Sequence, residues 1–352
     1  MGRAVDRVDR TQRRFPPLGV PIAVVYKFFD DQGNYLAATI TYYAFIAIFP
    51  LLLLGTSVLN VVLQGNPDLE KQVLDSALAQ FPIIGTELGV PGGLTGSTTA
   101  VVLGSLAAVY GALGLGQAIQ NATNVAWSVP RNRRPNPLLL RVKSLLLLML
   151  GGLAVLAITT LSIMASHTEV LGESITSYQW PIVVGTLLVN TLMFTLFFRV
   201  AAARRHSYRS AIAGAFAVAL MWLGLQYAGT WFVQRVLDST SEMNQTFGLV
   251  LGLIGIIFVA AVMGVLGMEV TVVLERRLWP RALLALFKDD VDLTDADRKA
   301  YSSYVLAQRH KTYERIELTW DRIPVVQVDQ PEVDPEPDAD QPAPDQRRGT
   351  NR

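Results

Sequence analysis

Six long stretches of this sequence contain no charged residue. No Asp, Glu, Lys or Arg occurs in the intervals 32–67, 88–130, 144–168, 174–198, 210–234 and 243–268. A helix needs roughly 20 apolar residues to cross a hydrocarbon core about 30 Å thick, and each interval holds such a run. In lipid, a loop or an open strand edge would leave backbone groups unpaired, so the runs are expected to be helices. We place them at Tyr35–Leu63, Thr98–Trp127, Leu138–Ser166, Pro181–Ala202, Ser210–Phe232 and Thr246–Leu274.

Positive charge falls almost entirely on one side of these six helices. If the N-terminus is inside, every Lys and Arg except Lys71 and Arg235 lies in an inside loop or a terminal segment. Lys and Arg concentrate in the cytoplasmic loops of membrane proteins, so this orientation is strongly favoured. The fold prediction is an all-α, polytopic plasma (inner) membrane protein with six transmembrane helices and both termini in the cytoplasm.

The sequence divides into four predicted parts. Residues 1–34 form a basic tail and a short interfacial helix, Leu18–Asp31, with Tyr26, Phe28 and Phe29 facing lipid. Residues 35–280 form the transmembrane domain, with an amphipathic helix at Asp68–Phe81 on the outside. Residues 281–320 form a cytoplasmic segment, in which a capping box at Thr294 and Asp297 begins a helix that runs to about Ile316. Residues 321–352 are acidic and rich in Pro, which predicts disorder.

Composition excludes several kinds of chemistry. The chain has no cysteine, so disulfides, thiolate catalysis and Cys-based metal sites are ruled out. The three histidines lie in separate segments without metal-ligand spacing, and no phosphate-binding loop or hydrolase motif is present. We therefore expect neither enzymatic activity nor a cofactor. The net charge of +1 gives no indication of a nucleic-acid partner.

The second predicted span ends in four amides that share one helical face. Gln117, Gln120, Asn121 and Asn124 are spaced at offsets of 0, 3, 4 and 7 residues. Such amides often form hydrogen bonds to a neighbouring helix. Alternatively, they line a polar cavity that opens to the cytoplasm. Both interpretations remain open at this point.

Glu269 is the carboxylate placed within a predicted span, near the cytoplasmic end of the last helix. An acid within a span is a functional candidate whose partner should be named. The candidates are Arg199, at the cytoplasmic end of the fourth span, and the amide stripe, which consists of Gln117, Gln120, Asn121 and Asn124. A purely structural ion pair or interfacial snorkelling is the alternative. Pro50, in the middle of the first span, predicts a bend in that helix.

Several short motifs resemble the YihY/BrkB family of membrane proteins. The order and spacing of these segments carry the resemblance over roughly residues 20–278: Phe28-Phe29-Asp30-Asp31, Tyr42–Leu51, Ala118–Trp127, Arg131–Pro135, Gly214-Ala215-Phe216, Phe247-Gly248 and Leu266–Val270. The resemblance implies a six-helix inner-membrane fold and no established activity. The family has carried the label ribonuclease BN, and some members are linked to serum resistance or proposed as exporters.

The resemblance also identifies candidate residues. Asp31, Pro50, Asn121 and Glu269 occupy matching motif positions. Two departures argue against an aromatic-lined site: Met268 stands where the family usually has Ala, and Phe258-Val259-Ala260 replaces aromatics common in the last span.

The leading functional hypothesis is movement or export of a small or lipid-like solute through a cavity lined by the amide stripe and Glu269. The second is a non-transporting scaffold that recruits envelope machinery. Ribonuclease activity is the least favoured, because no general base or metal site is recognisable. The expected partners are the bilayer and an unidentified solute; homo-oligomerisation is left open, and no nucleic acid is expected.

Overall fold

The computed structural model describes residues 15–62, 98–167, 175–203, 206–237, 242–283 and 291–320, together with Asp9 and Gln12. The chain divides into two compact units, residues 1–316 and 317–352. The described part contains eight α-helices, one short 3₁₀-helix and no strand, and all of its helices belong to the first unit. The predicted helix at Asp68–Phe81 and the tails at 1–8 and 321–352 lie outside the described residues.

The six predicted spans all form helices, with ends within a few residues of the expected positions except at the starts of α8 and α10 and the end of α9. Their bounds are α3 Gly33–Val62, α6 Thr98–Ala126, α7 Pro137–His167, α8 Ile175–Ala201, α9 Tyr208–Leu237 and α10 Glu242–Arg276. Within the described residues, four helices are long and apolar enough to cross a membrane: α7, α8, α9 and α10. The 3₁₀-helix η1, Arg131–Arg133, lies in the basic loop between α6 and α7.

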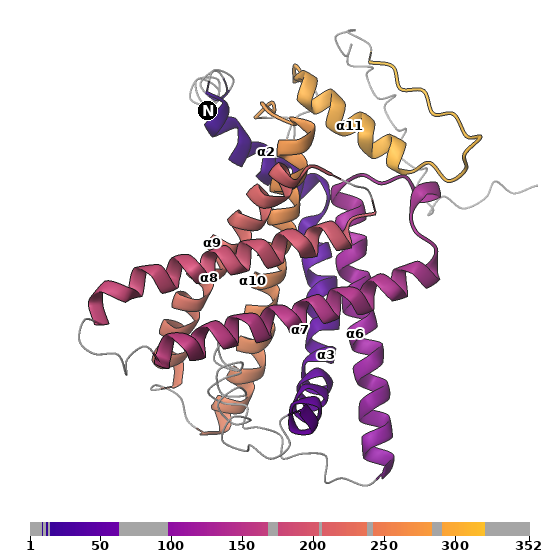
Figure 1. Cartoon of the computed structure of the whole chain (residues 1–352). Coiled ribbons are helices and arrows are strands. Elements are labelled where there is room, and N and C mark those ends of the chain that lie inside the picture. The colour runs from indigo at the N-terminus through magenta and orange to yellow at the C-terminus, as the bar shows by residue number, and fades with distance from the viewer. Residues whose placement is uncertain are drawn as a thin grey trace, which may run out of the picture. The chain divides into compact units, whose positions relative to one another are not determined.

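The helices pack mostly in chain order. α3 contacts α6, α6 contacts α7, and α7, α8 and α9 follow in sequence. α10 closes the arrangement by packing against α9, α3, α2 and α6. In Figure 1, α7 and α8 run side by side, in a direction that crosses those of α3, α6 and α10. α10 therefore brings α2 and α3, from the start of the described chain, together with α6 and α9.

The contact between α9 and α10 depends on two glycines. A Cβ atom added at Gly214 would collide with the Thr271 hydroxyl and the Gly267 carbonyl. A Cβ atom added at Gly267 would collide with a methyl group of Val218. Small residues allow helix backbones to approach closely in membranes, where burial in lipid gives no hydrophobic advantage to helix association.

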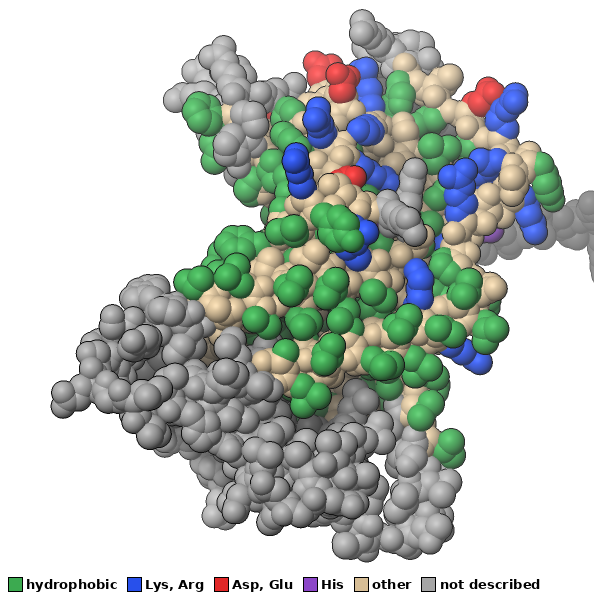
Figure 2. Space-filling view, viewed as in Figure 1, with side chains coloured by type: hydrophobic (Ala, Val, Ile, Leu, Met, Phe, Trp, Pro, Cys, Tyr) green, Lys and Arg blue, Asp and Glu red, His purple; other side chains and the backbone are tan. Residues whose placement is uncertain are grey.

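The outer faces of these helices are apolar. The exposed large side chains of α7 share this character and include Leu138, Leu139, Val142, Leu145, Leu146, Met149, Leu153 and Leu156. Figure 2 shows apolar side chains over the middle of this face, with Lys and Arg gathered toward the end where α2 and α11 lie. A soluble monomer rarely exposes so large an apolar surface, so this face is suited to lipid.

The predicted interfacial helix is present as α2, Pro16–Asp30, but its orientation differs from the prediction. Prolines in its first turn suit a helix start, where backbone N–H groups have no partner in the helix. Tyr26 and Phe28 are buried and only Phe29 is exposed. The prediction that all three face lipid was therefore wrong for Tyr26 and Phe28, because α2 packs against α10.

The capping box is confirmed, and the helix that it begins is shorter than predicted. Thr294 and Asp297 exchange both bonds of a capping box at the start of α11, Asp295–Ala307. The helix ends at Ala307 rather than near Ile316. The backbone N–H groups of His310 and Lys311 instead donate to the Glu314 carboxylate, which forms a turn in this charged stretch.

Candidate functional site

α2 carries an ion pair on its buried face. Lys27 and Asp31 are four residues apart, a spacing that brings side chains together on a helix. The Lys27 ammonium lies 2.5 Å from the Asp31 carboxylate, and the two side chains are 1% and 2% exposed. The backbone N–H of Asp31 donates to the Lys27 carbonyl and ends the helix at this point. The left-handed conformation of Gln32 (φ 56°) then turns the chain into α3.

Glu269 of α10 faces the same lysine. Its Oε2 atom lies 3.3 Å from Lys27 Nζ, and its side chain is fully buried. Neither carboxylate oxygen of Glu269 has a hydrogen-bond partner among the described residues. Glu269 therefore lies deeper than its position near a helix end suggested, and its ionic partner is Lys27 rather than Arg199.

Arg199 has other contacts. Its guanidinium donates to the His206 carbonyl at 2.9 Å and lies 3.6 Å from the centre of the Tyr208 ring. These contacts hold together the ends of α8 and α9, which are joined by a short connection. Arg199 thus lies at the α8–α9 turn, and its functional role stays a prediction.

A second set of charges adjoins the first. Arg281 follows α10 and is completely buried. Its NH2 atom lies 2.8 Å from Asp30 of α2, and its Nε atom pairs with Asp297 of α11. Asp297 also accepts from the backbone N–H groups of Ala282 and Thr294, each at 2.9 Å. One arginine therefore connects α2, the segment after α10 and α11.

We refer to these six residues as the ionic cluster: Lys27, Asp30, Asp31, Glu269, Arg281 and Asp297. It contains four carboxylates and only two basic groups, within a space closed by aromatic rings. The Lys27 ammonium lies 5.3 Å from the centre of the Tyr304 ring, and the Arg281 guanidinium lies 5.4 Å from that of Tyr301. Burial raises the pKa of both phenols, and the neighbouring carboxylates raise that of Tyr304 further.

The excess of carboxylates has an energetic consequence. Burial raises the pKa of Asp30 above its ordinary value of 3.8, although Arg281 acts in the opposite direction. Arg281 itself is held in its charged form, because Asp30 and Asp297 together outweigh the desolvation of its guanidinium, and its pKa is raised. Replacing a buried ion pair with apolar residues is often neutral or stabilising. The contribution of the ionic cluster to stability therefore does not by itself explain why these buried charges are present.

The four amides of α6 do not lie in one environment. Gln120 is buried and donates to the Ser144 hydroxyl and the Leu140 carbonyl of α7, each at 3.0 Å. Asn124 is also buried, and its side-chain oxygen has no hydrogen-bond partner in the described part of the chain. Gln117 and Asn121 are exposed, and Asn121 accepts a 3.4 Å bond from Arg134. Helix contact thus accounts for Gln120, and whether the others line a cavity stays a prediction.

Of the other candidates, Asp31 belongs to the ionic cluster. Pro50 lies within α3, but its side chain is outside the described part, so the predicted bend stays a prediction. No group of three His, Asp or Glu residues among the described residues is arranged to hold a metal ion.

Sequence reasoning missed Lys27, Arg281 and Asp297 as site residues. One signal was available for Lys27, since it is the single charged residue of an otherwise apolar helix until the Asp30-Asp31 pair. Its spacing of four from Asp31 suited an ion pair. No comparable signal connected Arg281 to Asp30, because they are far apart in sequence and meet only through the packing of α2 on α10.

A family model described as virulence factor BrkB matches residues 24–285, which is well over half of the chain. The match includes every residue of the ionic cluster except Asp297. No curated protein and no solved structure gives a significant match.

Proposed function

Because this chain belongs to the virulence factor BrkB family, we propose that it is an integral plasma-membrane protein that moves a small or lipid-like solute. In this proposal α3, α6 and the four apolar helices α7–α10 cross the bilayer, with both termini in the cytoplasm. The basic loop that contains Arg131 and Arg133, and the start of α9 with Arg209, then lie on the cytoplasmic side.

One observation carries the transport proposal: Glu269 is fully buried on a candidate span, and neither of its oxygens accepts a hydrogen bond within the described residues. Charged residues in spans are rare and mark transport pathways or proton relays. Its counter-ion, Lys27, belongs to α2, which is too short to cross a bilayer. A contact of this kind can open without unfolding a span, so α2 would act as a cytoplasmic gate over the end of α10.

The role of the amide stripe in this mechanism is to provide a polar wall near that gate. Asn124 supports this role, because its buried side-chain oxygen lacks a partner in the described part of the chain. No catalytic step is proposed for any of these residues.

The proposal is tested by measuring lipid movement in vesicles. The purified protein is reconstituted with a trace of fluorescent phospholipid, and an impermeant reductant bleaches the outer leaflet. We expect bleaching beyond one half of the signal for the wild type and a slower rate for Glu269→Gln. Glu275→Gln is the matched control, because Glu275 is an exposed carboxylate of the same helix, bonded to Ser210.

Bleaching that stops at one half for the wild type would reject lipid movement. A rate that is equal for wild type and Glu269→Gln would reject the role of the ionic cluster.

A scaffold function is the second candidate, and Gln120 favours it. Its bonds to Ser144 and Leu140 are those of a close-packed helix pair rather than of a water-filled wall. In this case the phenotype would depend on the C-terminal tail. Deletion of residues 321–352 without any consequence in cells would reject the scaffold function.

A further inference from the structure

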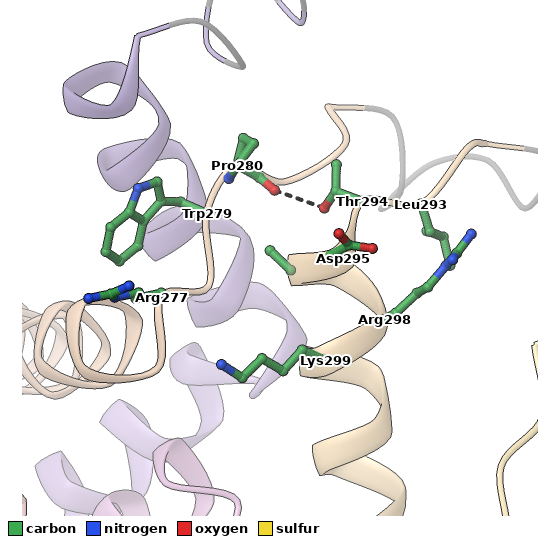
Figure 3. A pocket seen from close by; sticks show the side chains of 9 residues that line it. Arg277, Trp279, Pro280, Leu293, Thr294, Asp295, Arg298 and Lys299 are labelled. Atoms are coloured by element: carbon green, nitrogen blue, oxygen red, sulfur yellow. Dashed lines mark hydrogen bonds between the residues drawn. The ribbon is translucent and has the colours of Figure 1, made fainter.

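Basic residues and a tryptophan surround a pocket between the end of α10 and the start of α11. The pocket has a volume of about 630 Å³, and its lining includes Arg277, Trp279, Thr294, Asp295, Arg298 and Lys299. In Figure 3, Arg277, Trp279 and Lys299 extend to one side of the connecting loop, and Arg298 extends to the other. A 2.8 Å hydrogen bond from the Thr294 hydroxyl to the Pro280 carbonyl closes the loop above them.

The charge of this lining is unbalanced. The lining residues include three cations, Arg277, Arg298 and Lys299, and one carboxylate, that of Asp295. Arg277 and Arg298 have no ion pair within the part of the chain that the structure describes. The Lys299 ammonium donates to the Arg276 carbonyl at 2.5 Å, which leaves further N–H donors free for a ligand. The lining of the pocket therefore has an excess of positive charge that would favour a bound anion.

The backbone of Arg277 gives an independent indication. Its φ angle is 54°, in the left-handed region, and it directly follows the last residue of α10. Glycine is the usual residue at this position of a helix end, because it has no Cβ to clash. The next residue completes the turn, since the Leu278 N–H donates to the Val273 carbonyl at 3.1 Å. Arginine here lacks the conformational freedom of glycine, which is consistent with a role for its side chain.

The position of the pocket narrows the class of ligand. It lies directly after a candidate membrane span that ends at Arg276. Trp279 is only partly buried, and tryptophan is enriched at the level of lipid headgroups. Basic residues just outside a span attract anionic headgroups. Arginine and lysine both bind phosphate, with arginine able to form two parallel bonds.

From these observations we propose that the pocket between α10 and α11 binds a phosphate ester anion, that of an anionic phospholipid headgroup. Arg277 and Lys299 contact the phosphate from the side on which Trp279 packs against the glycerol and the first acyl carbons. Arg298 adds positive charge from the other side of α11. This binding site is separate from the ionic cluster and does not depend on solute movement.

The test uses the full-length protein in an uncharged detergent. Native mass spectrometry measures binding of dioctanoyl phosphatidylglycerol, dioctanoyl phosphatidylcholine and inorganic phosphate, and thermal unfolding is followed in parallel. Each juxtamembrane cation contributes about 1 kcal/mol, which corresponds to about fivefold in affinity. We therefore expect Arg277→Gly and Lys299→Ala each to weaken phosphatidylglycerol binding about fivefold. Arg209→Ala, which removes an exposed cation at the start of α9, should leave it unchanged.

Arg277→Gly separates loss of the ligand from loss of the fold. Glycine relieves the strain at φ 54°, so this variant should unfold at the same temperature as the wild type or higher while it binds the lipid more weakly. If inorganic phosphate binds as tightly as phosphatidylglycerol and with the same dependence on Arg277, the pocket is still a phosphate site. Its ligand is then a free anion instead of a lipid headgroup. Equal binding by wild type, Arg277→Gly and Lys299→Ala would overturn the proposal, as would an equal loss in Arg209→Ala.

Discussion

Removal of the Lys27 charge is the most direct test of the ionic cluster. Lys27→Met keeps an unbranched apolar side chain as far as Cε and removes the ammonium that lies 2.5 Å from Asp31 and 3.3 Å from Glu269. Both carboxylates are buried, and Glu269 has no hydrogen bond from any other described residue. The substitution therefore leaves two carboxylates close together without their counter-ion.

The expected loss of stability is large. Removing one partner of a buried pair costs about 3–5 kcal/mol, because the remaining charge is desolvated and uncompensated. Glu269→Gln should cost less than about 1 kcal/mol, since Lys27 keeps Asp31 and the variant removes a carboxylate whose hydrogen bonds are unmet. The double variant Lys27→Met/Glu269→Gln should recover about 1–3 kcal/mol of the loss, which is the range for side chains in one network.

The assay is unfolding of the purified protein in mixed micelles, with the detergent composition varied and helicity followed by circular dichroism. Lys143→Met is the matched control. Lys143, near the start of α7, is half-buried and donates to the Ala202 carbonyl at 3.0 Å, and it forms no ion pair with a carboxylate among the described residues. Its loss should cost about 1 kcal/mol, the net value of one hydrogen bond. The reasoning would be refuted if Lys27→Met lost no more unfolding free energy than Lys143→Met does. It would also be refuted if the effects of Lys27→Met and Glu269→Gln simply added in the double variant.

Three further predictions concern other parts of the chain. Because burial raises the pKa of Asp30 above 3.8, its protonated form favours the fold, and this contribution is lost as pH rises through the folded pKa. Asp30→Asn stays neutral at every pH. Its stability relative to the wild type should therefore increase as pH rises from about 4 to the folded pKa, as measured by thermal unfolding. Gly214→Ala should cost about 1–3 kcal/mol by overpacking, whereas Gly224→Ala on the same helix, with open space around it, should be neutral or stabilising by up to about 1 kcal/mol in the same measurement. Asn121→Cys, at an exposed position beside Arg134, should react with an impermeant thiol reagent added from the cytoplasmic side.

Each of these predictions has a contradicting result. A stability difference between wild type and Asp30→Asn that is constant with pH would show that Asp30 titrates normally. Equal effects of Gly214→Ala and Gly224→Ala would contradict the close approach of α9 and α10. Protection of Asn121→Cys from both sides of the membrane would place the amide stripe against lipid or protein and favour the scaffold function.

The helices could be predicted because their signal is strong and local. An interval without charge, long enough to cross a bilayer, is sufficient to place a helix, and the positions of α3, α6 and α7 agree closely with those predicted. The capping box at Thr294 is likewise a short-range pattern with one geometry. What could not be predicted is the direction of packing. Nothing in the sequences of α7 and α8 indicated that they cross α3 and α6, since their apolar residues surround the helix instead of marking one face.

The same limit explains the error over the partner of Glu269. Arg199 was a reasonable candidate, because both residues were expected at the cytoplasmic ends of spans. The choice of Lys27 depends instead on α2, whose aromatic side chains were expected to face lipid. Once Tyr26 and Phe28 pack inward, Lys27 must also point inward, because it lies between them in the sequence on a buried face. Among the described residues, its ion pairs are then with Asp31, directly after α2, and with Glu269 of α10.

This dependence suggests why the charges belong together. The inward face of α2 and the Asp31 that follows it together hold a lysine and two aspartates, so α2 cannot bury that face unless α10 and its continuation supply Glu269 and Arg281. Conversely, Glu269 has no other counter-ion in the described part of the chain, so release of α2 would expose a carboxylate at the end of a span. Docking of α2 and neutralisation of Glu269 are therefore one event. If a solute or a proton replaces Lys27 at Glu269, the position of α2 must change with it, and solute binding can be followed through the mobility of α2.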